Sequence, residues 1–165
     1  MSYGTLSASK TYHAARGNTA WAAADDADLT IALLRGSEYV DFMFRRQFPG
    51  YKTDLRSQVR EWPRIDAFDI ENNSIASTEV PVEVEYATYE AALRELASPG
   101  SLMPDVTLGK QIKTASVDDA VSVEYVGAIG AHGMRPTLSV VQSIIAPVLT
   151  GAGGGSSIAG RTYRI

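Results

Sequence analysis

Apolar side chains recur every three or four residues along several stretches of the chain, and this spacing predicts amphipathic helices. A short helix is expected over residues 6–16, with Ser7 or Ser9 as its N-cap. A cluster of three aspartates then favours the start of a long helix that extends from about residue 25 to residue 46. The predicted buried positions of the long helix are Leu29, Leu33, Gly36, Val40, Met43 and Phe44.

Two further helices are expected in the second half of the chain. One opens at Ser77 or Thr78, carries Pro81 in its first turn and stops at a Pro-Gly pair. The other follows Pro136, and Pro147 is expected to kink or loosen its final turn. The predicted apolar stripes are Val82, Tyr86, Tyr89, Leu93 and Leu96 on the first, and Leu138, Val141, Ile145 and Val148 on the second.

The remaining segments predict a loop and a β-hairpin. Residues 47–73 show little periodicity and many turn-forming residues, so we expect an ordered loop that Trp62 and Phe68 hold against the core. Residues 121–125 alternate between apolar and polar side chains, and residues 108–116 are the expected partner strand. The predicted fold class is therefore mainly α (α+β), a small helical bundle with a β-hairpin.

The length of 165 residues suits a single domain with a core of its own, which we place at residues 1–150. Residues 151–165 differ in composition, because they contain five glycines and end in Arg-Thr-Tyr-Arg-Ile. Such a composition is typical of a flexible linker. We therefore predict an extended, glycine-rich C-terminal arm.

Net charge and cysteine content exclude several classes of protein. The formal net charge of −4 argues against a basic protein that coats nucleic acid, and the absence of cysteine excludes disulfides and thiolate chemistry. The first ten residues lack the profile of a signal peptide, and no apolar run approaches the roughly 20 residues that span a bilayer. We expect a non-secreted protein without membrane contact.

Charged residues are distributed unevenly along the chain. Residues 45–64 contain six basic and two acidic residues, whereas residues 69–95 contain seven acidic residues and one arginine. Opposed patches of this kind are compatible with head-to-tail association of identical subunits into a ring, and equally with two solvated faces of a monomer.

The basic segment also carries aromatic residues, a combination that suits stacking on single-stranded DNA. The same aromatic residues are equally expected in a protein core. One hypothesis is therefore a single-stranded DNA-binding replication accessory protein. Its candidate residues are Arg45, Arg46, Arg56 and Arg60, with Phe44, Phe48, Tyr51 and Trp62.

No motif in the chain predicts catalysis. The only histidines, His13 and His132, lie outside any nucleophile motif, and the carboxylates of residues 66–71 lack the spacing of a calcium loop. Residues 155–162 have the spacing of a phosphate loop, but only three residues follow them, too few for the helix that such a loop requires. We expect no catalytic residue, no cofactor and no metal.

A series of short sequence blocks is spread over much of the chain. They are Ser2-Tyr3-Gly4-Thr5, Tyr12-His13-Ala14-Ala15-Arg16-Gly17, Trp21, Tyr39-Val40-Asp41, Phe48-Pro49-Gly50, and Gln58 ahead of Trp62-Pro63-Arg64. Together they resemble the head-tail connector (adaptor) proteins of tailed phages, which are often labelled DnaT-like single-stranded DNA-binding proteins. The Trp-Pro-Arg block is the most specific element of this resemblance.

The resemblance implies a helical bundle with a small β element, assembled as a dodecameric ring. The implied partners are further copies of the chain, the portal protein above and a neck, stopper or tail-completion protein below. Packaged double-stranded DNA would pass through the ring without sequence-specific binding. The implied location is the portal vertex of the virion, after synthesis in the host bacterial cytoplasm.

The resemblance also suggests roles for particular residues. The arm is expected to dock onto the portal through Arg161, Thr162, Tyr163, Arg164 and Ile165. The subunit interface or the central loop is expected to involve Arg45, Arg46, Arg60, Trp62, Pro63, Arg64, Glu83 and Glu90. A structural connector is thus the first expectation, and the single-stranded DNA-binding protein is its alternative.

Overall fold

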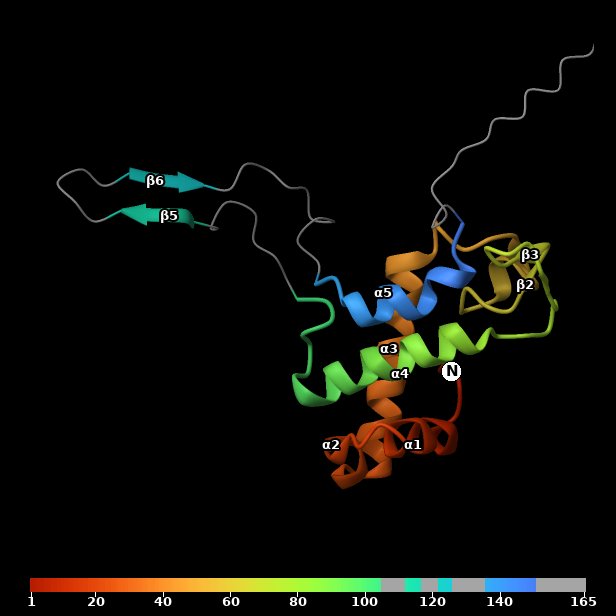
Figure 1. The fold of residues 1–165 in the computed structure, drawn as a ribbon, viewed down its shortest axis with the longest axis horizontal. Coiled ribbons are helices and arrows are strands. Elements are labelled where there is room, and N and C mark those ends of the chain that lie inside the picture. The colour runs from red at the N-terminus through yellow and green to blue at the C-terminus, as the bar shows by residue number, and fades with distance from the viewer. Residues whose placement is uncertain (105–111, 117–121, 126–135, 151–165) are drawn as a thin grey trace, which may run out of the picture.

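Helices form most of the regular structure, and short two-stranded ladders form the rest (Figure 1). The computed structural model describes residues 1–104, 112–116, 122–125 and 136–150. The predicted mainly α (α+β) class is confirmed. Within these residues, no helix is long and apolar enough to cross a membrane. The predicted arm, with its docking residues 161–165, lies outside the described part of the chain.

Two short helices begin the fold. The first, α1 (Leu6–Ala14), lies within the predicted segment, but its N-cap is Thr5, whose hydroxyl accepts from the Ala8 amide at 3.1 Å. The prediction of a serine N-cap is therefore wrong. The second, α2 (Thr19–Ala23), is not predicted by the pattern, because five residues are too few to show a helical period.

The two longest helices cross each other (Figure 1). The first of them, α3 (Asp26–Phe44), is capped by Asp25, as the aspartate cluster predicts, and its predicted positions are buried except for the partly buried Met43. The second, α4 (Val82–Ala97), starts later than predicted, because Pro81 has extended backbone angles and is the N-cap. A proline also disfavours helical geometry in the residue before it, so the helix cannot begin earlier.

The buried face of α4 differs from the predicted stripe. Val82 and Tyr86 are 47% and 38% exposed. At the crossing with α3, a Cβ on Gly36 would lie 2.7 Å from the Thr88 carbonyl oxygen and 2.9 Å from the Ala92 amide nitrogen. The close approach of the two backbones therefore requires small side chains. The buried residues of α4 are Val84, Ala87, Thr88, Tyr89, Ala91, Ala92 and Glu95.

The last helix and the predicted hairpin are both present. The helix α5 (Ser139–Ile145) continues into a single 3₁₀ turn, η3 (Ala146–Val148), which contains Pro147, so the predicted loosening is confirmed. The strands β5 (Ile112–Ser116) and β6 (Ser122–Tyr125) pair in antiparallel orientation, as predicted.

The loop between α3 and α4 contains more regular structure than predicted. Two short antiparallel pairs form within it, β1 (Tyr51–Lys52) with β2 (Arg64–Ile65) and β3 (Ala67–Phe68) with β4 (Ser74–Ile75). A 3₁₀ turn, η1 (Leu55–Ser57), lies between β1 and β2. Strands of two residues are too short to show an alternating pattern in the sequence.

Only one of the two aromatic residues expected to hold this loop is buried. Trp62 is 2% exposed and packs in the core, as predicted. Phe68 is 45% exposed, so the prediction for it is wrong. Successive side chains of a strand point to opposite sides, and in β3 the inward position is taken by Ala67.

The buried apolar residues form two clusters. The N-terminal cluster joins α1, α2 and the first half of α3 to α4, and the central cluster joins the second half of α3 to the loop, α4 and α5. The N-terminal cluster consists of Tyr12, Trp21, Leu29, Ala32, Leu33, Tyr89 and Ala92. The central cluster includes Tyr3, Tyr39, Val40, Phe44, Phe48, Trp62, Val84, Val141 and Ile145.

Candidate nucleic-acid interface

The six basic residues of the segment 45–64 fall into two groups. Arg60 and Arg64 are each 7% exposed. Lys52 is partly covered, and its ammonium lies 3.3 Å from a carboxylate oxygen of Glu61. Arginines 45, 46 and 56 are exposed. Only half of the positive charge counted along the segment is therefore presented to solvent.

Arg60 joins the N-terminus and the loop to α3. Its Nε donates to the Met1 carbonyl at 2.7 Å, and its Nη1 donates to Oδ2 of Asp41 at 3.2 Å. Asp41 also accepts from the Tyr3 hydroxyl. Burial raises the pKa of Asp41, and the hydrogen bonds from Tyr3 and Arg60 act in the opposite direction. The Arg60 guanidinium is thus bonded within the chain. The single-stranded DNA hypothesis requires it to be exposed to DNA, so the prediction for Arg60 is wrong.

Arg64 is also used inside the chain. Its Nε donates to the Pro49 carbonyl at 2.6 Å, its Nη2 donates to the Gly50 carbonyl at 2.7 Å, and its Nη1 lies 3.1 Å from Oε2 of Glu61. Together with the buried Trp62, these bonds hold the loop after α3 in place. The guanidinium pairs with a carboxylate of its own chain, that of Glu61.

A cleft opens between the second half of α3 and the loop residue Val59. Its volume is about 330 Å³, and we call it the Phe42 cleft. Phe42 and Val59 are 45% and 83% exposed. Arg45, the C-cap residue of α3, lies three residues after Phe42, and its Cζ is 4.8 Å from the centroid of the Phe42 ring. The lining residues are Glu38, Asp41, Phe42, Arg45, Val59 and Arg60.

In the part of the chain that the structure describes, Arg45 forms no ion pair with a carboxylate. Among the described residues, the ion pairs do not involve Arg45, Arg46 or Arg56. The carboxylates that line the cleft belong to Asp41, which is bonded to Arg60, and to Glu38. A cationic group stacked on an exposed aromatic ring is suited to contact both a phosphate and a base.

The aromatic residues of the basic segment are mostly core residues. Phe44, Phe48 and Trp62 are 2–5% exposed, so they do not offer the stacking surface considered in the single-stranded DNA hypothesis. Tyr51 is exposed. Phe42 is not among the residues predicted from the sequence, although its place off the buried stripe of α3 and three residues before Arg45 is a signal that could identify it.

Some acidic residues of the segment 69–95 are bonded or partly buried within the fold. Oε1 of Glu90 accepts from the Tyr12 hydroxyl at 2.8 Å, and Glu83 is partly buried on the same helix. Burial and Glu90 together raise the pKa of Tyr12. Glu90, an expected interface residue, is thus bonded within its own chain.

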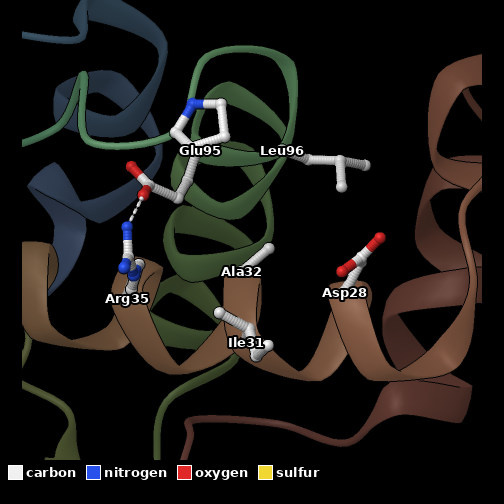
Figure 2. Close-up of a pocket in the computed structure, with 7 residues that line it drawn as sticks. Asp28, Ile31, Ala32, Arg35, Glu95 and Leu96 are labelled. Atoms are coloured by element: carbon white, nitrogen blue, oxygen red, sulfur yellow. Dashed lines mark hydrogen bonds and ion pairs between the residues drawn. The ribbon is translucent and has the colours of Figure 1, made fainter.

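A second cleft lies between the first half of α3 and the end of α4. Its volume is about 230 Å³, and we call it the Glu95 cleft. Figure 2 shows Arg35 and Glu95 pointing toward each other, with Nη1 of Arg35 at 2.6 Å from Oε1 of Glu95. Asp28 adds a second carboxylate to the lining. The remaining lining residues are Ile31, Ala32, Leu96 and Pro99.

The described residues contain no group of three histidine or acidic side chains placed to hold a metal ion. His13 is fully buried, and its Nδ1 lies 2.9 Å from the side-chain nitrogen of Asn18. Burial lowers the pKa of His13. Its ring packs on the ring of Trp21, with the two centroids 4.3 Å apart, so His13 is part of the packed core. His132 lies outside the described residues.

Comparison with known proteins gives one family. The family described as "Putative DnaT-like ssDNA binding protein" matches residues 1–165. No curated protein and no solved structure matches the chain.

The family match corrects the first expectation from the sequence. The structural connector is wrong, because the family that covers the whole chain is described by single-stranded DNA binding, which was the alternative. The assignments to a virion, a neck and a portal are withdrawn with it. Self-association and the absence of catalysis stay predictions.

Proposed function

The chain belongs over its full length to this family of DnaT-like single-stranded DNA-binding proteins, and we propose that it binds single-stranded DNA as a non-catalytic accessory to replication. The observation that carries the proposal is Arg45 stacked on Phe42 at the edge of the Phe42 cleft, where no carboxylate of the described residues is paired with it. This arrangement supports contact with a phosphate and an unpaired base at one place.

The proposed binding surface is smaller than the sequence composition indicates. Its cations are the exposed arginines at positions 45, 46 and 56, and its aromatic groups are Phe42 and Tyr51. Three cations that each displace a counterion from single-stranded DNA give a slope of log K against log salt of about −2. Affinity is therefore expected to fall roughly 15-fold between about 50 and 200 mM salt.

Unpaired bases are required for stacking, so single strands are expected to bind more tightly than duplexes. Base–aromatic stacking contributes about 1–3 kcal/mol per base and tolerates any sequence, because every base has a π face. In a duplex the bases stack on each other, and only the phosphate contacts remain available.

Fluorescence anisotropy with a labelled thymidine oligomer of about 15 nucleotides tests the proposal. The charge-reversed variant Arg45→Glu/Arg46→Glu/Arg56→Glu is expected to lose binding, because the surface then repels phosphate. Arg94→Glu is the control, since Arg94 is an exposed arginine on the acidic helix α4. The proposal is refuted if the native chain does not bind at low salt, or if the triple variant binds as the native chain does.

A further inference from the structure

The Phe42 cleft contains a carboxylate that the fold leaves available. Oε1 of Glu38 lies 3.9 Å from Nη2 of Arg60, which is beyond hydrogen-bond distance, and the Glu38 side chain is 41% exposed. The other cleft carboxylate, Asp41, accepts bonds from Tyr3 and Arg60 and is 5% exposed. Glu38 is therefore an acceptor at the cleft with capacity for an external donor.

We infer that the Phe42 cleft takes a single guanine base of the DNA strand, an inference that rests on the proposed function. The cleft volume of about 330 Å³ is at the lower end of the roughly 300–1,000 Å³ of small-ligand sites. Phe42 and Val59 supply apolar surface for the base, and Glu38 supplies the hydrogen-bond acceptor.

Guanine is the base whose donors suit a carboxylate. Its Watson–Crick edge presents the N1–H and the N2 amino group side by side, and this edge is accessible only in a single strand. Thymine presents two carbonyl oxygens and one N–H on the same edge, so its oxygens would face a negative charge. Glu38 therefore favours guanine over thymine.

Arg45 has a different role from Phe42 and Glu38. Its guanidinium covers the Phe42 ring at 4.8 Å, so a base that stacks on this ring displaces it. The displaced guanidinium then lies beside the strand, where a phosphate is its natural partner. Phe42 and Glu38 thus select the base, and Arg45 positions the backbone.

The experiment compares a thymidine oligomer of about 15 nucleotides with the same oligomer carrying one central guanine. A bidentate pair gives about 5- to 150-fold discrimination, so the guanine oligomer is expected to bind at least about 5-fold more tightly. Glu38→Gln is expected to abolish this preference and to bind the thymidine oligomer more tightly, because it removes a negative charge from a cleft that faces DNA. Phe42→Ala is expected to weaken both oligomers about 5- to 150-fold.

Two matched variants control for position and exposure. Phe68 is 45% exposed, the same fraction as Phe42, and lies on β3 outside the cleft, so Phe68→Ala is expected to bind both oligomers as the native chain does. Glu83 is partly buried on α4, and Glu83→Gln is expected to keep the guanine preference.

The outcomes separate the two proposals. A native chain that binds neither oligomer overturns the proposed function and this inference with it. A native chain that binds both oligomers equally, or a Glu38→Gln variant that keeps the guanine preference, overturns the inference alone. Circular dichroism spectra that match the native chain establish that each variant is folded.

Discussion

The Glu95 cleft and the Phe42 cleft lie on the two halves of α3, and each places an arginine beside apolar side chains. In the Glu95 cleft, Arg35 is paired with Glu95 at 2.6 Å. In the Phe42 cleft, Asp41 is bonded to Arg60 and Glu38 lies 3.9 Å from the same guanidinium, so that no ion pair among the described residues includes Arg45. Clefts of similar composition therefore differ in electrostatics because of the pairing of their charges, and only the Phe42 cleft is suited to phosphate.

The largest expected effect is a difference in stability between variants of the two arginines of the Phe42 cleft, Arg60 and Arg45. Arg60→Met leaves the Asp41 carboxylate buried without its cationic partner and is expected to cost about 3–5 kcal/mol of unfolding free energy. Arg45→Met changes an exposed side chain and is expected to cost less than about 0.5 kcal/mol. Urea unfolding of the two variants measures both values.

Two further observations sharpen this comparison. Arg60→Met/Asp41→Leu removes both partners and is expected to recover much of the lost stability, because no unpaired charge remains buried. Equal destabilisation by Arg60→Met and Arg45→Met would show that Arg60 is not a structural residue.

The positions of the helices are predictable from the sequence, but the face that α4 buries is not. Spacing of apolar residues locates α1, α3, α4 and α5, since each lies within a predicted segment. Hydrophobicity favours Val82 and Tyr86 as core residues, whereas Gly36 on α3 requires a small-residue face opposite it. The requirement arises from the contact between the two helices, so it cannot be deduced from the sequence of α4 alone.

The sequence names part of the candidate site, since Arg45, Arg46, Arg56 and Tyr51 are exposed, but it does not separate them from the buried members of the same segment. Composition identifies 45–64 as basic and aromatic, but Arg45 and Arg60 are the same residue type, and only contacts with Asp41 and Met1 distinguish them. The blocks that carry the family resemblance, including Trp62, belong to the network that holds the scaffold together. They therefore indicate the fold more directly than the binding surface.

The next effect is expected in the Glu95 cleft. Glu95→Gln removes the partner of Arg35, whose side chain is half exposed, so a cost of about 1 kcal/mol in stability is expected. The released cation, Arg35, lies seven residues before Phe42 on α3, about 10 Å along the helix axis and within reach of the same oligomer. Binding of the thymidine oligomer is expected to become tighter, and its salt slope steeper by about 0.7.

The measurement is a salt titration of Glu95→Gln beside the native chain, with Arg35→Met/Glu95→Gln as the control that removes both charges. The double variant is expected to return to the native slope. An unchanged slope in Glu95→Gln would show that the ion pair is not what keeps DNA from the Glu95 cleft.

The smallest expected effect is a pH dependence of stability that concerns the N-terminal cluster and not the central cluster. His13 is fully buried against Trp21 and Tyr89 in the N-terminal cluster, and burial lowers its pKa below the ordinary value of 6.5. As pH falls below 6.5, the unfolded chain takes up a proton that the folded chain does not. Unfolding free energy is therefore expected to fall with decreasing pH, by at most about 1.4 kcal/mol per pH unit.

Hydrogen exchange between pH 7 and pH 5.5 locates this loss. Amides of α1, α2 and the first half of α3 are expected to lose protection before those of α5, because the neutral imidazole is needed only in the N-terminal cluster. His13→Gln removes the titrating group, and its stability is expected to show a smaller pH dependence over the same range. Uniform loss of protection in both clusters would mean that the two halves of α3 unfold together, and the Phe42 cleft would then share the acid sensitivity of the Glu95 cleft.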